Sequence, residues 1–170
     1  MLNLLDSHDT GRILSLADGD SELVILALAL LLTMPGAPCI YYGTEVDLEG
    51  GPDPDSRRGF PWDRVGEPSE IGTAIRELIA IRRDEPGLRS GDFERIGPAP
   101  GPDFGITYLF ARGDGSDRVV VALNHADEAD VVPLGDSLSP KAVHLWGDAQ
   151  LGPKAIDLPP RSVGIWKDPR

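Results

Sequence analysis

Two polar clusters in the sequence contain residue types that do chemistry, and each follows a short apolar stretch. His8 and Asp9 come after the first stretch, residues 1–6, and a run of aspartates and arginines at 53–58 comes after the second, residues 37–42. A histidine and an aspartate beside carboxylates and guanidinium groups can hydrogen-bond several hydroxyl groups at once. An ionised aspartate can also stabilise developing positive charge. The clusters therefore indicate a candidate site for a hydroxyl-bearing ligand.

The sequence around the clusters predicts a strand–helix–strand unit. Residues 1–6 and 37–42 resemble short buried strands, and the leucine- and alanine-rich run 23–34 between them predicts a helix buried on every face. Such a unit implies parallel strands, whose carboxyl ends form the edge where ligands bind. The charged residues expected on that rim are Asp6, His8, Asp9, Glu45, Glu49, Asp53, Asp55, Arg57 and Arg58.

Each member of the clusters also has a simpler interpretation. Asp9 followed by Thr10 is typical of local turn or cap chemistry, and residues 53–55 are typical of a turn or of a weak cation site. Two adjacent arginines, at 57–58, are commonly a solvated pair. Two adjacent tyrosines, at 41–42, are ordinarily core residues, although an aromatic ring at a rim can stack on a sugar. Only the order and spacing of these motifs are specific.

The rest of the chain divides into a helical part and a β-rich part. A polar loop at residues 44–64 is of a length that is usually functional or disordered. Apolar residues at helical spacing predict a helix over 69–83 that ends at 85–87. Its predicted buried face is Ile71, Ala74, Ile75, Leu78 and Ile79.

After residue 90, short runs of β-branched and aromatic residues alternate with turn residues, which predicts an antiparallel sheet or sandwich. We therefore expect one domain at 1–90 and a second at 91–170. The predicted strands of the second are 106–112, 118–124, 129–134, 142–146 and 162–167.

Three motifs, in this order, resemble glycoside hydrolase family 13, the α-amylase family. The family's fourth signature region is similar to Asn3-Leu-Leu-Asp-Ser-His-Asp-Thr10, and its approach to the eighth barrel strand is similar to Pro35-Gly-Ala-Pro-Cys-Ile-Tyr-Tyr-Gly-Thr-Glu45. The cyclomaltodextrinase, neopullulanase and maltogenic amylase branch resembles Leu48-Glu-Gly-Gly-Pro-Asp-Pro-Asp-Ser-Arg-Arg58, continued by Phe60-Pro-Trp62. The tail resembles the β-sandwich that follows the barrel in those enzymes.

This resemblance implies a fold and a set of roles. The fold is α/β followed by all-β: the last two βα units of a (β/α)8 TIM barrel, then a C-terminal antiparallel β-sandwich. The implied activity is retaining hydrolysis of α-1,4-linked glucans by three acids. Asp9 falls on the third acid, which stabilises the transition state, His8 on a histidine that binds the same sugar, and Asp53 and Arg57 on residues that bind the neighbouring glucose. Thr44 departs from the acidic or amide residue usual there.

Two further catalytic groups are missing from the resemblance. Retaining hydrolysis needs a nucleophile and an acid/base about 5–5.5 Å apart. In the family both come from earlier strands, and this chain starts at what would be the seventh. Asp9 and Glu45 could lie close on adjacent strands, but the family pattern gives neither that role. We therefore expect a C-terminal fragment of an α-glucan or cyclodextrin hydrolase that is inactive alone, with the missing N-terminal barrel segment as a partner.

Two other interpretations remain open. The β-rich tail could be a non-catalytic sugar-binding or assembly module, with Trp146 and Trp166 as stacking residues, although both tryptophans filling the sandwich core is the simpler interpretation. The chain could also be a truncated gene product without activity. No cofactor is expected: calcium occurs in the family, but no dedicated set of ligands is visible.

The composition limits the possible partners. Twenty-eight acidic against sixteen basic residues give a formal charge of −12, which argues against nucleic-acid and membrane-surface binding. With 19 Asp to 9 Glu and 13 Arg to 3 Lys, the surface suits concentrated salt, so we hypothesise a halophilic source. Residues 23–34 are too short to span a membrane and lack the basic start of a signal peptide, which favours a cytoplasmic location. Cys39, the single cysteine, is expected to be a core residue.

Overall fold

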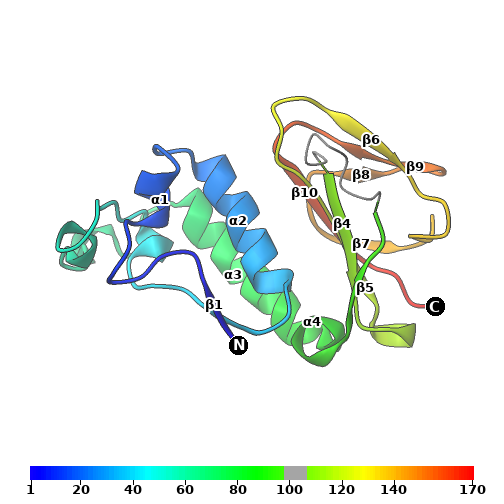
Figure 1. The fold of residues 1–170 in the computed structure, drawn as a ribbon, viewed down its shortest axis with the longest axis horizontal. Coiled ribbons are helices and arrows are strands. Elements are labelled where there is room, and N and C mark those ends of the chain that lie inside the picture. Colours follow the sequence, from blue (N-terminus) through cyan, green and yellow to red (C-terminus); the bar gives the residue numbers. More distant parts are fainter. Residues whose placement is uncertain (98–106) are drawn as a thin grey trace. The chain divides into compact units, whose positions relative to one another are not determined.

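The computed structural model describes residues 1–97 and 107–170 (Figure 1). By their internal contacts these residues form two compact units, which are Met1–Leu32 with Gly36–Ala80 (unit 1) and Thr33–Pro35 with Ile81–Arg170 (unit 2). The limit between the units falls inside a helix, Glu70–Asp84 (α3), since it follows contacts and not the ends of elements. The predicted domains at 1–90 and 91–170 stay a prediction.

Unit 1 begins with the predicted strand–helix–strand arrangement. β1 (Leu2–Leu4) pairs in parallel with β2 (Ala37–Cys39). Two helices lie between the strands in the sequence, a short one that was not predicted, α1 (Ile13–Leu16), and the predicted one, α2 (Ser21–Thr33). The parallel pairing brings the carboxyl ends of both strands to one edge.

The sheet of unit 1 leaves apolar side chains in solvent. Leu2 and Leu4 are 61% and 46% exposed. Cys39 is also exposed, so the prediction that it is a core residue is wrong. Alternate residues of a strand point to opposite faces, and Ala37 shares the exposed face of Cys39 because it lies two residues away. In the described part of the chain, this face of β2 is open.

α2 is largely but not completely buried. Asp20 caps its first turn, because the Leu23 amide donates to Asp20 Oδ1 at 3.0 Å. The prediction of burial on every face is wrong: Leu23 is exposed, and Ile25, Ala27 and Leu30 are half-buried. Leu23, Ala27 and Leu30 follow a spacing of four and three, so they share one helix face, whereas Ile25 lies off this face. The remaining faces contribute the buried residues Val24, Leu26, Leu28, Ala29, Leu31 and Leu32.

α3 confirms the predicted helix and most of its buried face. Ile71, Ala74, Ile75 and Leu78 are buried, whereas Ile79, at the edge of the stripe, is 45% exposed, contrary to the prediction. The helix ends at Asp84, before the predicted stop. Pro86 then begins another short helix, α4 (Pro86–Ser90), because proline is well suited to the first turn of a helix.

Unit 2 consists mainly of two antiparallel sheets, with strand orders β3-β4-β5-β10-β7 and β6-β9-β8. The strands are β3 (Phe93–Arg95), β4 (Thr107–Arg112), β5 (Val119–Asn124), β6 (Asp130–Pro133), β7 (Val143–Gly147), β8 (Gln150–Leu151), β9 (Ala155–Leu158) and β10 (Ser162–Lys167). Five of them match predicted strands, whereas β3, β8 and β9 were missed. Ile106, the first residue of one predicted strand, lies outside the described residues.

The two sheets share one hydrophobic core, as in a β-sandwich. β4, β5 and β10 of the first sheet bury side chains in the same cluster as β6 and β9 of the second. Members of this cluster include Leu109, Ala111, Val120, Ala122, Val132, Ile156, Leu158 and Trp166.

Unit 2 also buries an ionic contact next to this core. Asp168 is 0% exposed and accepts hydrogen bonds from Arg118 Nη1, from Arg170 Nε at 3.0 Å and from the Ser139 amide at 3.1 Å. Arg118 Nη2 donates to Ser137 O at 3.0 Å. Burial lowers the pKa of Arg118, although Asp168 opposes this shift. Among the described residues, no helix has the length and apolar character that crossing a membrane requires.

Candidate functional site

The structure brings the four predicted site residues together in unit 1. His8 Nε2 lies 3.2 Å from Asp9 Oδ2, and Arg57 Nη2 lies 3.7 Å from Asp9 Oδ1. Arg57 Nε lies 2.8 Å from Asp53 Oδ1 and forms an ion pair with it. The side chains of His8 and Asp9 are 61% and 69% exposed. The four residues, hereafter the His8–Asp9 cluster, therefore offer a histidine, two carboxylates and a guanidinium to a ligand. Their individual roles stay predictions.

Backbone and side-chain bonds hold the loop after β2 against the end of β1. The His8 carbonyl accepts from Ser56 Oγ at 3.0 Å and from Arg57 Nε at 3.2 Å. A short 3-10 helix, η2 (Asp55–Arg57), places Ser56 and Arg57 for these bonds. Because residues 8 and 56 are far apart in the sequence, this contact closes the cluster.

The turn interpretation of Asp9 holds as well, but it uses other atoms. The Ser7 amide donates to Thr10 Oγ1 at 3.0 Å, and the Asp9 amide donates to Ser7 Oγ at 3.1 Å. These bonds form a local turn from the backbone of Asp9 and the hydroxyls of its neighbours. The Asp9 carboxylate is therefore left for His8, Arg57 and a ligand.

Asp55 and Arg58 close the loop instead of joining the cluster. Arg58 donates from Nε to Asp55 Oδ1 at 2.7 Å and from Nη2 to Oδ2 at 2.8 Å. The Gly51 amide donates to Asp55 Oδ2 at 2.7 Å. The bond from Arg58 and then that from Gly51 lower the pKa of Asp55. Among the described residues, no group of three or more His, Cys, Asp or Glu side chains is arranged to hold a metal ion.

Two residues that anchor this region were not predicted as anchors. Asp6, expected on the rim, is buried, and its Oδ2 accepts from the Ile13 amide at 3.0 Å and from Thr44 Oγ1 at 3.3 Å. Arg12, which the prediction missed, donates from Nε to Ser56 O at 2.7 Å and from Nη1 to the Tyr42 carbonyl. In the sequence, the one feature that could have pointed to Arg12 is its place directly before the apolar residues of α1.

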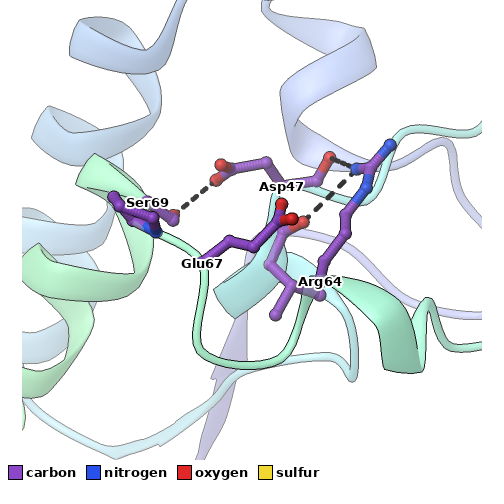
Figure 2. A pocket seen from close by; sticks show the side chains of 6 residues that line it. Asp47, Arg64, Glu67 and Ser69 are labelled. Carbon is purple, nitrogen blue, oxygen red and sulfur yellow. Dashed lines mark hydrogen bonds between the residues drawn. The ribbon is translucent and has the colours of Figure 1, made fainter.

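Unit 1 also has two pockets that no residue of the His8–Asp9 cluster lines, and Glu45 lines the larger one. Figure 2 shows the smaller pocket, of about 180 Å³, with Asp47, Arg64, Glu67 and Ser69 around it. Ser69 Oγ donates to Asp47 Oδ1 at 2.8 Å, and Arg64 Nη1 donates to Asp47 O at 3.3 Å.

The larger pocket, of about 640 Å³, shares lining residues with the smaller one and is also lined by Glu45 and Trp62. Trp62 is 78% exposed and packs on Phe60 at 4.8 Å between ring centroids. α3 supports this region through Gly72, where a Cβ would lie 2.4 Å from Glu45 O. The helix can approach the loop this closely because residue 72 has no side chain.

The two tryptophans of unit 2 lie in different environments. Trp166 is 1% exposed within the sandwich core, which confirms the simpler interpretation for this residue and contradicts a stacking role for it. Trp146, in β7, is half-buried.

Comparison with known proteins places this arrangement in a family. The family described as "Alpha amylase, catalytic domain" matches residues 1–90. The fold of this family contains a TIM barrel, so residues 1–90 belong to that fold class. The cyclomaltodextrinase of Geobacillus thermopakistaniensis (strain MAS1) is 37% identical over 133 residues, which are 78% of this chain and 22% of the relative. The cyclomaltodextrinase of Thermoanaerobacter pseudethanolicus is 32% identical over 167 residues, 98% of this chain and 28% of the relative.

Solved structures agree with the sequence matches. The debranching enzyme of Nostoc punctiforme, in its acarbose-soaked crystal structure, superposes on 98% of this chain with a TM-score of 0.79 and 40% identity, and 33% of that chain is covered. The chain therefore belongs to the α-amylase family, and it resembles the branch that contains cyclomaltodextrinases and maltogenic amylases. It spans only about a quarter of the length of the curated relatives it matches.

Proposed function

We propose that the chain forms part of the substrate site of a retaining α-glucan or cyclodextrin hydrolase. In this proposal Asp9 stabilises the transition state, His8 binds the same sugar, and Asp53 and Arg57 bind the neighbouring glucose. The observation that carries the proposal is the His8–Asp9 cluster, in which Arg57 contacts both carboxylates from a loop that follows a different strand. The names of the relatives, cyclomaltodextrinase and maltogenic α-amylase, support the substrate class.

The chemistry of the cluster suits this role. An ionised Asp9 offers acceptor oxygens to sugar hydroxyls, and its negative charge stabilises the positive charge of an oxocarbenium-like transition state. Arg57 donates to hydroxyl oxygens and holds Asp53 in place at the same time. Because these side chains are half exposed or more, a sugar can reach them without a rearrangement of the core.

Hydrolysis needs more than this cluster. A nucleophile and an acid/base carboxyl group, which the family takes from earlier barrel strands, have to lie on either side of the bond that is cleaved. We therefore propose that the chain alone binds sugar weakly and does not hydrolyse it. The first six βα units of a related barrel, on the same polypeptide or on another, would supply both groups.

Calorimetric titration with maltotriose and with a cyclodextrin tests the binding part. We expect binding by the unmodified chain and a loss of at least about tenfold in Asp9→Asn, because a charge-assisted hydrogen bond contributes roughly 1.5–3 kcal/mol. The control is Asp63→Asn, an exposed aspartate outside the cluster, which should bind normally. Equal binding by all three proteins would disprove the assignment of the site.

A reducing-sugar assay tests the catalytic part. The isolated chain should release no more sugar than a blank. Addition of the N-terminal barrel segment of a related cyclomaltodextrinase should restore turnover if the segments associate, and Asp9→Asn should abolish the restored activity. Turnover by the isolated chain that Asp9→Asn removes would show that the chain carries all the groups it needs.

A further inference from the structure

Arg12 is a buried cation between the two loops that form the His8–Asp9 cluster. Its side chain is 0% exposed. Its Cζ lies 4.1 Å from the ring centroid of Tyr41 and 4.5 Å from that of Tyr42. Nε donates to Ser56 O and Nη1 donates to Tyr42 O. The guanidinium therefore connects Tyr42, three residues after the end of β2, to η2.

Ser56 carries this contact onward to His8. Its carbonyl accepts from Arg12, while its hydroxyl donates to His8 O at 3.0 Å. The next residue, Arg57, donates to the same His8 carbonyl and forms an ion pair with Asp53. A shift of Ser56 therefore moves both hydrogen bonds that hold η2 against the end of β1.

We propose that Arg12 is a positioning residue for this site. It holds Ser56 in place, so that Arg57 lies at a fixed distance from His8 and Asp9. That the cluster so positioned binds sugar rests on the proposed function; that Arg12 orders the cluster does not. Arg12 acts through Ser56 and Arg57 and contacts no substrate itself.

The chemistry of the position explains why an arginine is used. The guanidinium donates in two directions, to the carbonyls of Ser56 and Tyr42. Its flat, charged face also packs against the rings of Tyr41 and Tyr42. Lysine would offer one compact ammonium group to the same partners. Arg12 Nη2 is buried without a hydrogen-bond partner among the described residues, which is unfavourable for folding. An arginine at residue 12 is therefore better explained by its effect on the positions of Ser56 and Arg57 than by its effect on stability alone.

Proton exchange at the Arg57 Nε–H group, measured by NMR on the ligand-free chain, tests the inference. Arg12→Met removes both donors and keeps an apolar chain of similar length. It should speed this exchange at least about tenfold, because the hydrogen bond from Arg57 Nε to His8 O, which protects the proton, would open more often. Arg12→Lys should give an intermediate rate. The control is Arg83→Ala, which breaks an exposed pair with Asp84 outside this loop and should leave the rate unchanged.

The outcomes separate positioning from general loosening and from the sugar hypothesis. If backbone amides of α3 exchange faster to the same extent as Arg57, Arg12 is merely structural and the proposal is wrong. Where Arg12→Met does not fold, Arg12→Lys and Ser56→Ala decide, and unchanged Arg57 exchange in both overturns the proposal. Because no ligand is present, a chain that fails to bind maltotriose but shows the Arg12 effect contradicts only the proposed function.

Discussion

Aspartate–arginine contacts occur in both units, but in opposite environments. In unit 1, Asp9 and Arg57 have side chains that are 69% and 50% exposed. In unit 2, Asp168 is completely buried and contacts Arg118, which is 9% exposed. Exposed pairs stabilise a fold by about 0–1 kcal/mol, whereas loss of one partner from a buried pair costs about 3–5 kcal/mol. The same residue types are therefore accessible from solvent in one unit and form a buried contact in the other.

The difference is one of hydrogen-bonding capacity. The oxygens of Asp168 are used by Arg118, Arg170 and a backbone amide. Within the described residues, the oxygens of Asp9 form ion pairs with His8 and Arg57, which are themselves at the surface. An exposed carboxylate can exchange water for sugar hydroxyls. A carboxylate with access to solvent is available to a ligand, while a satisfied buried one is not.

Substitution of the buried aspartate is the strongest test of this contrast. Asp168→Asn keeps the size of the side chain but leaves Arg118 buried without its ion-pair partner, so we expect a loss of about 3–5 kcal/mol in the free energy of unfolding. Urea unfolding followed by tryptophan fluorescence measures it. The control, Asp127→Asn, removes the partner of Arg161 Nε in an exposed pair and should change stability by less than about 1 kcal/mol. Equal losses in both variants would end the contrast.

The exposed aspartate should give the reverse result. Asp9→Asn is expected to weaken maltotriose binding at least about tenfold, while the free energy of unfolding changes by less than about 1 kcal/mol. Titration calorimetry and urea unfolding of the same protein preparation provide the two values. A variant that loses binding only because it unfolds would place Asp9 with the buried group.

Local patterns explain what the sequence predicted correctly. The spacing of Ile71, Ala74, Ile75 and Leu78 predicts α3 because helical periodicity depends on neighbouring residues. Burial was predicted less well, since exposure of Leu23 and Cys39 depends on what packs against them. β9 (Ala155–Leu158) was missed because it is short and follows Pro153 and Lys154 closely.

The candidate site shows the same limit. His8, Asp9, Asp53 and Arg57 could be proposed because their order along the chain resembles a family motif, and the structure places them together. Arg12 could not be proposed, because its contacts depend on residues 42 and 56, whose positions follow only from the folded loop.

Salt should affect the two environments differently. With a formal charge of −12, repulsion between surface carboxylates should decrease between low and molar KCl, so we expect the unfolding midpoint to rise by a few degrees. The buried Asp168 contact is screened little, so Asp168→Asn should show the same rise from a lower starting value. Differential scanning calorimetry in a KCl series measures both. The halophilic hypothesis fails if the midpoint stays constant or falls.

The smallest effect is expected at Asp55, an exposed aspartate with a well-formed partner. Hydrogen bonds from Arg58 and Gly51 lower its pKa in the folded chain, so the ionised form stabilises folding. This contribution is present above the unfolded pKa of about 3.9 and is lost as the pH falls through the lower, folded pKa. The difference in unfolding midpoint between the unmodified chain and Asp55→Asn should therefore be small at neutral pH and shrink further in acid. A difference for Asp55→Asn that grows on acidification would contradict the assigned direction.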